Sequence, residues 1–371
     1  MKILALEPYY GLSHMAFIDG WIEHSRHEFT LLTLGANKWK WRMRHAAITF
    51  ARKVSRLISE GHRFDAVFCS DMLNLAEFLG LCPQLRGVPS VAYFHENQLT
   101  YPNRFESERD YQYVMTNLTT MSAADAVWFN SRYHREEFLP ALRSFLKRMP
   151  DNQPLEAIDS IYEKSSIHNP GIMPFAQRDI RRPGPMRILW AARWEHDKNP
   201  DDFFAAVKEL KVQGVEFRLS VIGEQFRDSP EVFDWAREYF AEHIDHFGYQ
   251  SAIDDYRDVL LSTDVFVSTA DHEFFGISAL EAIAAGNYPL LPNRLAYPEL
   301  IENLAPQLSG EFLYDLPIGS LVEKLVILAE RLKNGKLFED GVGLAAATEK
   351  FLYKTLAPKM DDAMEILSTK H

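Results

Sequence analysis

Short apolar runs alternate with longer amphipathic stretches along this chain. Such runs are typical of buried strands, and the stretches between them carry apolar residues at helical spacing. In the first half, the pattern predicts strands at residues 3–6, 29–34, 66–69, 90–94 and 126–129. It predicts helices at residues 16–24, 44–59, 73–79, 111–123 and 132–146. Strands that alternate with helices indicate a parallel sheet with helices on both faces.

A turn-rich stretch at residues 150–154 interrupts the alternation, and a last short strand closes at 167–171. Residues 177–186 then hold three Arg, two Pro and one Gly, as an interdomain linker does. The pattern resumes beyond them with a helix at 200–213. The later strands are predicted at residues 187–191, 217–222, 264–268 and 288–291.

Two doubly wound, Rossmann-like α/β domains facing across a cleft are therefore predicted. The first covers residues 1–175, a linker covers 176–186, and the second covers 187–354. A terminal helix is predicted over about residues 355–371. Pro358 suits its first turn, where a missing N–H costs least. We expect this helix to cross back onto the first domain.

The composition is that of a globular protein without a membrane span. Hydrophobic residues make up 47% of the 371 residues and charged residues 25%. No apolar run approaches the roughly 20 residues that cross a bilayer, and the N-terminus lacks a signal-peptide pattern. The two cysteines, Cys69 and Cys82, fit a reducing compartment. We therefore expect a cytoplasmic protein.

The net charge of −12 argues against broad nonspecific binding to nucleic acids, but the charge is uneven. Residues 36–59 contain no Asp or Glu and seven basic residues. These are Lys38, Lys40, Arg42, Arg44, Arg52, Lys53 and Arg56, and Trp39 and Trp41 alternate with the first of them. The segment predicts either a dedicated polyanion site or a solvated amphipathic helix whose tryptophans pack on the core.

Ligands of doubly wound sheets bind at the carboxyl ends of the strands, so the loops there hold the candidate chemistry. After the first strand, Gly11 would let a ligand approach the backbone, and a helix beginning near Ser13 would offer free amides to an anion. His14 belongs to the same loop. The alternative is a plain strand-to-helix turn, and the spacing is not that of a dinucleotide-binding GxGxxG loop.

A second loop, after the strand at 187–191, carries Arg193 and Lys198. Together these side chains could clamp a diphosphate leaving group, Arg through paired hydrogen bonds and Lys as a point charge. The alternative is an Arg–Glu–Lys ion network on the surface. The position at a strand end favours the functional interpretation.

A third loop, at residues 272–281, places two glutamates around a glycine. Glu273 would face a sugar, and Glu281, about two turns into the following helix, would bind ribose hydroxyls. The helix start would offer free amides to phosphate oxygens. The candidate contacts there are Phe274, Phe275, Gly276 and Ile277. The alternative is a surface helix with two exposed glutamates, which the apolar flanks of Glu281 disfavour.

His95 follows the strand at 90–94, in a His-Glu-Asn-Gln run. A lone His is more often structural, but this run is richer in polar groups than packing requires, so His95 could face the sugar from the opposite domain. The sequence has no Walker A loop, no metal-ligand spacing and no Asp-x-Asp pair. We therefore predict a metal-free transfer, in which cations and helix dipoles stabilise a leaving diphosphate.

Glu273 and Glu281, separated by seven residues, together with Arg193 and Lys198, resemble glycosyltransferase family 4, whose members are retaining enzymes of the GT-B fold. The resemblance implies that Glu273 contacts the donor sugar and that Glu281 contacts the nucleoside ribose. It also implies that Arg193 and Lys198 hold the diphosphate.

Six segments together are similar to the tRNA-queuosine alpha-mannosyltransferase family: residues 9–14, 38–42, 93–99, 109–113, 193–198 and 272–276. The resemblance implies transfer of mannose, with retention, from GDP-mannose to the cyclopentenediol of queuosine at the wobble position of aspartate tRNA. Two departures are visible. Leu12 stands where a glycine is expected, and the long insertion of animal members near the linker is absent.

The resemblance gives the basic segment a partner. A tRNA needs neutralised phosphates and stacked bases. The candidate contacts are Lys38, Trp39, Lys40, Trp41, Arg42 and Arg44. Two other interpretations stay open. One is a family 4 enzyme with another nucleotide sugar and a cell-envelope or small-molecule acceptor, and the other is a non-catalytic module that binds a nucleotide sugar or tRNA.

Overall fold

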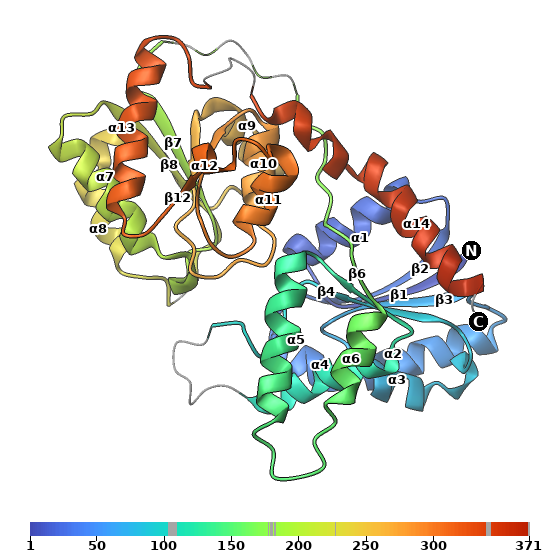
Figure 1. Ribbon diagram of the computed structural model, residues 1–371. Coiled ribbons are helices and arrows are strands. Elements are labelled where there is room, and N and C mark those ends of the chain that lie inside the picture. The colour runs from blue at the N-terminus through green and yellow to red at the C-terminus, as the bar shows by residue number, and fades with distance from the viewer. Residues whose placement is uncertain are drawn as a thin grey trace. The chain divides into compact units, whose positions relative to one another are not determined.

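The computed structural model describes residues 1–102, 110–176, 178, 181, 183–226, 228–338 and 343–369. Two compact units divide the chain, Met1–Met173 with Phe351–His371 and Pro174–Lys350, and we call them the first and the second unit. Each contains a parallel six-stranded sheet between two layers of helices (Figure 1). The predicted α/β class with doubly wound sheets is therefore confirmed.

The sheet of the first unit has the order β2-β1-β3-β4-β5-β6. Its strands are β1 (Lys2–Tyr10), β2 (Glu28–Gly35), β3 (Ala66–Ser70), β4 (Ser90–Phe94), β5 (Ala126–Phe129) and β6 (Ser165–Ile167). Its helices are α1 (Leu12–His24), α2 (Trp39–Ser59), α3 (Leu75–Leu81), α4 (Tyr111–Ala123), α5 (Arg132–Leu146), α6 (Glu156–Glu163) and α14 (Tyr353–Thr369). Residue 109, from the segment 109–113 singled out above, lies outside the described residues.

Alternate residues of β1 face the two layers of this unit. Ile3 and Ala5 pack in the core shared with α1 and α14, whereas Leu4 and Leu6 pack in the core shared with α2 to α6. This is the two-residue period of a strand buried on both faces. Both faces of β1 are therefore covered, and its carboxyl end leads directly into the loop at Gly11.

The sheet of the second unit has the order β12-β11-β10-β7-β8-β9. Its strands are β7 (Met186–Ala191), β8 (Phe217–Ile222), β9 (Ile244–Gly248), β10 (Val265–Val267), β11 (Tyr288–Pro292) and β12 (Leu313–Tyr314). Its helices are α7 (Pro200–Val212), α8 (Val232–Tyr239), α9 (Ile253–Ser262), α10 (Ile277–Ala284), α11 (Tyr297–Leu304), α12 (Ser309–Phe312) and α13 (Gly319–Lys333).

The first strand is longer than predicted, because β1 continues through Pro8 to Tyr10. Its pairing with β2 shifts register between Glu7 and Tyr10. A proline in such an irregularity deprives the ladder of no regular hydrogen bond. The sequence prediction ended the strand at Leu6 because it treated the proline as a breaker.

The terminal helix begins at Tyr353, so Pro358 lies inside it and the placement of this proline in the first turn is wrong. Asp361 of this helix is buried and accepts hydrogen bonds from the Trp21 indole (2.8 Å) and the Arg26 backbone amide (2.9 Å). These contacts hold α14 against α1 (Figure 1). Packing of this kind outweighs the backbone hydrogen bond that an internal proline removes.

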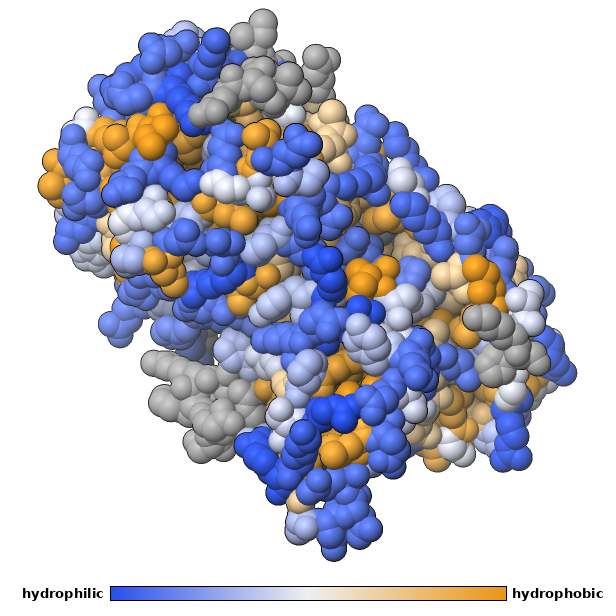
Figure 2. Space-filling model, in the orientation of Figure 1, coloured by the Kyte–Doolittle hydropathy of each residue, from blue (hydrophilic) through white to orange (hydrophobic). Residues whose placement is uncertain are grey.

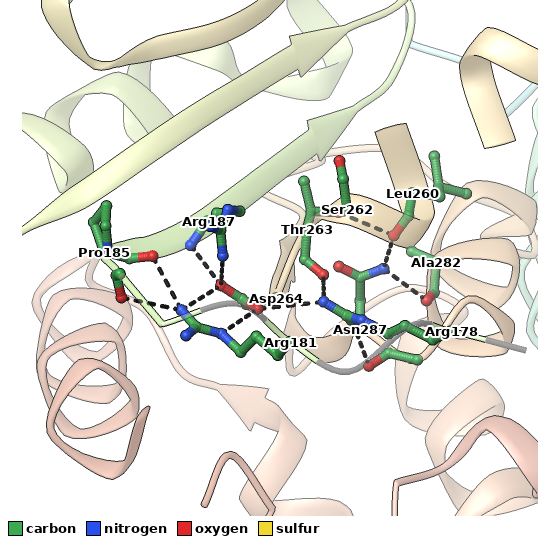
Figure 3. Close-up of polar contacts among 12 residues, drawn as sticks. Arg178, Arg181, Pro185, Arg187, Leu260, Ser262, Thr263, Asp264, Ala282 and Asn287 are labelled. Atoms are coloured by element: carbon green, nitrogen blue, oxygen red, sulfur yellow. Dashed lines mark hydrogen bonds and ion pairs between the residues drawn. The ribbon is translucent and has the colours of Figure 1, made fainter. Parts of the chain in front are cut away.

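A buried carboxylate at the amino end of β10 ties the start of the second unit to its sheet (Figure 3). Asp264 is fully buried and accepts hydrogen bonds from Arg181 Nε (2.7 Å), Arg178 Nη2 (3.2 Å) and the Arg187 backbone amide (2.8 Å). Of the predicted linker 176–186, residues 177, 179–180 and 182 lie outside the described residues. The charges of Arg178 and Arg181 are thus engaged within the second unit.

Replacing Asp264 with asparagine is expected to lower the free energy of unfolding of the second unit by about 2 kcal/mol, because it leaves buried donors around a neutral group. Urea unfolding followed by tryptophan fluorescence measures the change. Asp245→Asn is the matched control, since Asp245 pairs with Arg218 on the surface with both side chains about one-third exposed, and its loss should cost below about 0.5 kcal/mol. Equal effects of the two substitutions would contradict this account.

No described helix combines the length and the apolar character that a bilayer crossing requires. On the face drawn in Figure 2, hydrophobic residues lie in small patches among hydrophilic ones.

Candidate active site

Lys198 is a buried cation at the carboxyl end of β7, with only 9% of its surface exposed. Its ammonium donates a hydrogen bond to the His272 carbonyl (2.7 Å) and lies 3.1 Å from Asp197 Oδ2 and 3.6 Å from Glu273 Oε2. Burial by itself would lower the pKa of Lys198, but the carboxylates of Glu273 and Asp197 outweigh burial and raise this pKa. The side chain therefore stays charged inside the protein.

Glu273 and Lys198 line one small pocket of the second unit, although 75 residues separate them in the chain. The walls come from the ends of β7 and β10 and from α10 and α11, and include Ala191, Ser268, Ser278 and Tyr297. The Glu273 side chain is 24% exposed, so a ligand can reach its carboxylate. The structure thus brings together two candidates that the sequence places on separate loops.

The start of α10 is open to an anion. Gly276 has φ +91°, in the left-handed region that favours glycine, and an added Cβ would lie 3.0 Å from the Tyr297 ring. No side chain caps this helix start in the described chain, so amides of its first turn point outward without intrahelical acceptors. Just before the helix, the Phe275 amide donates a hydrogen bond to Glu273 Oε1 (3.4 Å).

Glu281 lies about one turn after Ile277, the first residue of α10, and is half-buried rather than exposed. The Tyr256 hydroxyl donates a hydrogen bond to Glu281 Oε2 (2.7 Å). Burial raises the pKa of Glu281, and the hydrogen bond from Tyr256 opposes that rise. The alternative of a surface helix with two exposed glutamates is therefore wrong. Tyr256 was missed from the sequence because it belongs to α9, whose pattern gave no prediction.

Arg193 is more accessible than Lys198, with its side chain 38% exposed. Its guanidinium lies 3.1 Å from Glu195 Oε2. Of the alternative Arg–Glu–Lys surface network, only the Arg193–Glu195 pair is present, because Lys198 contacts Asp197 and Glu273 inside the protein. Both cations stay at the carboxyl end of β7.

In the first unit, Gly11 has a packing reason to be glycine. An added Cβ would lie 2.5 Å from the Ala36 side chain, so the close neighbour is the loop after β2. Leu12, which stands where a glycine is expected, has φ +48°. That left-handed conformation costs a residue with a Cβ about 1 kcal/mol. Ser13 is exposed in the first turn of α1, which no side chain caps in the described chain.

His14 is buried, and its Nδ1 lies 3.3 Å from Glu7 Oε1. Burial would lower the pKa of His14, but the Glu7 carboxylate outweighs burial and raises that pKa to about 9. The His14 ring packs against the His95 ring with the centroids 3.9 Å apart. Burial, the His14 cation and His134 hold the pKa of His95 well below its usual range.

The loop that carries His95 is held by buried amides. The His95 amide donates to Asp71 Oδ1 (2.9 Å), and the His95 carbonyl accepts from Asn130 Nδ2 (2.8 Å). Asn97 is fully buried and lies 3.1 Å from His134 Nε2 through its own Nδ2. The polar run predicted from the sequence therefore serves in part to fix the backbone around His95.

Glu7, His14 and His95 are the group in the described residues that brings three metal-ligand atoms within 4.8 Å of one another. Sequence spacing does not reveal this group, because its members come from separate segments. Glu7 Oε1 already accepts hydrogen bonds from the Tyr9 amide (2.8 Å) and the Ser70 hydroxyl (3.0 Å). We therefore interpret the group as a buried ion pair with a stacked ring rather than as a metal centre.

The basic segment 36–59 contains all of α2, and its two tryptophans, both in the first turn of the helix, differ. Trp39 packs on Tyr113, with the ring centroids 5.1 Å apart. Trp41 is 61% exposed, and its ring lies 4.9 Å from that of His45. Trp39 fits the interpretation in which the tryptophans pack on the core, whereas the exposed Trp41 remains available to a ligand.

The basic side chains of this segment also divide into two kinds. Lys38 and Lys40 are exposed, and the Arg44 side chain is 43% exposed above the Tyr113 ring. Arg42 instead donates to the Gly35 carbonyl (2.9 Å) and holds the loop before α2. Lys38 directly precedes α2, and Lys40 and Arg44 lie in its first two turns, with Lys40 Nζ 5.6 Å from the centroid of the Trp39 ring.

Two family models and a curated relative match this chain. Residues 2–172 match the family model for the N-terminal part of tRNA-queuosine alpha-mannosyltransferases, and residues 176–325 match the model for glycosyl transferases group 1. The tRNA-queuosine alpha-mannosyltransferase of Drosophila melanogaster is 36% identical over 317 residues, which cover 81% of this chain and 82% of the fly protein. The chain belongs to the tRNA-queuosine alpha-mannosyltransferase family. As a member of that family it is a hexosyltransferase, as the sequence resemblance implied.

Solved structures place this tRNA-queuosine alpha-mannosyltransferase family member in the GT-B fold. Sucrose-phosphate synthase from Thermosynechococcus elongatus aligns over 100% of both chains, with a TM-score of 0.71 and 14% identity. HepE from Anabaena, in complex with UDP and glucose, has a TM-score of 0.68 and 13% identity over 99% of this chain and 100% of its own. At such identities the likeness shows the fold alone.

Proposed function

We propose that this chain transfers mannose from GDP-mannose to queuosine in aspartate tRNA, with retention at the sugar, without a metal ion and in the cytoplasm. The buried Lys198–Glu273 pair beside the uncapped start of α10 carries the proposal. It is the kind of arrangement that a negatively charged sugar donor needs. Membership of the tRNA-queuosine alpha-mannosyltransferase family supports the choice of donor and acceptor.

In this proposal the second unit binds the donor. Lys198 and Arg193 hold the diphosphate, Glu273 accepts hydrogen bonds from the sugar, and Glu281 accepts hydrogen bonds from the ribose. Amides at the start of α10 bind phosphate oxygens. The backbone contacts assigned there are Phe274, Phe275, Gly276 and Ile277.

The reaction breaks the bond between the sugar C1 and the phosphate oxygen and forms a bond from C1 to a queuosine hydroxyl on the same face. The hydroxyl proton passes to the departing phosphate oxygen, so no nucleophile of the chain is required. Negative charge grows on the diphosphate as the bond breaks. Fixed cations and helix amides stabilise that charge without reorganising.

The first unit contributes the remaining groups of the proposal. His95 contacts the reacting sugar, and Gly11, Ser13 and His14 form the loop beside it. The acceptor tRNA lies along the start of α2, where the exposed cations neutralise phosphates and Trp41 stacks on an unpaired base. Arg42 supports this surface by holding the preceding loop.

The test is incubation of the purified protein with queuosine-containing tRNA and GDP-mannose, UDP-galactose or UDP-glucose, followed by mass spectrometry of the released nucleosides. We expect a hexose on queuosine with GDP-mannose, and the same yield in the presence of EDTA. Transfer from UDP-galactose or UDP-glucose but not from GDP-mannose would contradict the proposed donor and assign that UDP-sugar instead. No transfer to tRNA with any donor, together with donor hydrolysis, would point to another acceptor, and neither activity would point to a binding module.

A further inference from the structure

The side chains around His95 form a compact charged group at the carboxyl ends of β1, β3 and β4. Titratable groups face its two histidines from every neighbouring element. They are Glu7 and Tyr9 of β1, Asp71 after β3, Tyr93 at the end of β4, Glu96 beside His95, and His134 of α5. This is more ionisable chemistry than a strand-to-helix turn needs, and the proposed transfer mechanism leaves Glu7 and the imidazole of His14 without a role.

An ion pair and a neighbouring ring organise this group. Glu7 anchors His14 at 3.3 Å, and the resulting cation lies face to face with the His95 ring, at 3.9 Å between centroids and 31° between planes. A cation over an aromatic face is attracted to it while the second ring stays neutral. A second proton on His95 would put two cations in contact inside the protein, which burial makes costly.

We propose that Glu7 and His14 are positioning residues for His95, and that their ion pair fixes both the orientation and the charge of the imidazole that meets the donor sugar. A neutral ring suits that place, because the transition state of glycosyl transfer carries positive charge on the sugar. The kinetic part of this inference rests on the proposed function of His95. The charge of His95 itself can be measured without any substrate.

The direction of the effect follows from the charges. Burial and the His14 cation lower the pKa of His95, whereas burial raises the pKa of the neighbouring Asp71 to about 8. Removing the His14 cation must therefore raise the pKa of His95. Activity carried by the neutral ring is present above that pKa and falls roughly tenfold for each pH unit below it.

Two substitutions test this device. His14→Phe keeps a ring against His95 and removes the charge, and Glu7→Gln keeps the acceptor for Tyr9 and Ser70 and removes the anion that holds His14 charged. Carbon-13-labelled histidine lets NMR follow the titration of His95, whose signal is assigned by its loss in His95→Asn. We expect both variants to move the midpoint of the His95 titration to higher pH. The acidic limb of the pH profile of kcat/KM should move to higher pH with it. Activity should then fall several-fold more at about pH 6 than at about pH 8.

His24→Gln is the matched control, because His24 lies on the same helix with its ring against Tyr353, and it should leave both readings unchanged. Glu7→Asp, which keeps the carboxylate, should stay close to the wild-type profile. An unchanged His95 titration in both test variants overturns the proposal. A His95 titration midpoint that moves to higher pH while the acidic limb of kcat/KM stays in place also overturns the proposal, because the charge of His95 would then not matter for transfer. If the protein transfers no sugar to tRNA, the proposed function fails and the NMR titration still decides whether the ion pair sets the charge of His95.

Discussion

Replacing Lys198 with alanine is expected to lower kcat/KM for sugar transfer by about 10²–10³-fold, or about 3–4 kcal/mol of transition-state stabilisation. The ammonium is buried and fixed between Asp197, Glu273 and the His272 carbonyl. A cation held in this way meets the charge that grows on the leaving diphosphate without first giving up water. Its loss also leaves Glu273 without its partner. Steady-state transfer to queuosine-containing tRNA measures the effect, with circular dichroism as the check on folding.

The matched control is Lys208→Ala, since Lys208 is an exposed lysine of α7 that lies over the Trp235 ring. This change should leave transfer unaltered. A folded Lys198→Ala protein with wild-type kcat/KM would remove Lys198 from the site. A variant with a raised KM and an unchanged kcat would restrict the lysine to binding of the donor ground state.

Reversing Lys38, Lys40 and Arg44 to glutamate is expected to weaken tRNA binding by about 10³-fold or more near 0.1 M salt. The slope of log K against log salt should become shallower by about three, one for each lost phosphate contact. The three side chains are exposed on one segment that contains no acidic residue. Filter binding of queuosine-containing tRNA over a series of salt concentrations measures both quantities.

A charge-matched control reverses Lys2, Lys354 and Lys359, three exposed lysines elsewhere in the first unit. Because both triple variants change the net charge equally, a general field effect would weaken both alike. A specific surface at α2 would weaken only the first. Wild-type transfer by the α2 variant would exclude this surface and favour a small-molecule acceptor. Arg42 is left intact in this design, because it holds the loop before α2.

The central parts of both sheets could be predicted from the sequence almost to the residue. β4 and β5 are mostly apolar runs with their side chains buried on both faces, and the predicted bounds of β4, β5 and β8 agree with the structure. β9 and β12 were missed, because an edge strand needs no continuous apolar run and β12 has only two residues. α6 was hidden behind the turn-rich stretch at 150–154, where local turn formers dominate the pattern.

The candidate site could be predicted wherever its chemistry sits at a strand end. Lys198 and Glu273 follow β7 and β10, and the parallel sheet brings such ends to one edge. The partners of those residues could not be found in this way. Tyr256 reaches Glu281 from another helix, and Glu7 is buried within a strand that reads as apolar. Contacts of that kind depend on tertiary packing, which leaves no local signature.

The attachment of α14 to α1 also sets an order of events during synthesis. The first unit is discontinuous in the chain, since its last helix follows the whole second unit. The ribosome therefore synthesises the second unit as one uninterrupted stretch. Until α14 is made, the Trp21 indole of the first unit lacks its hydrogen-bond acceptor, Asp361. Domains generally fold as they emerge. The unit that is made first is therefore completed last, and a chain truncated before Tyr353 would lack α14 and leave the first unit incomplete while sparing the second.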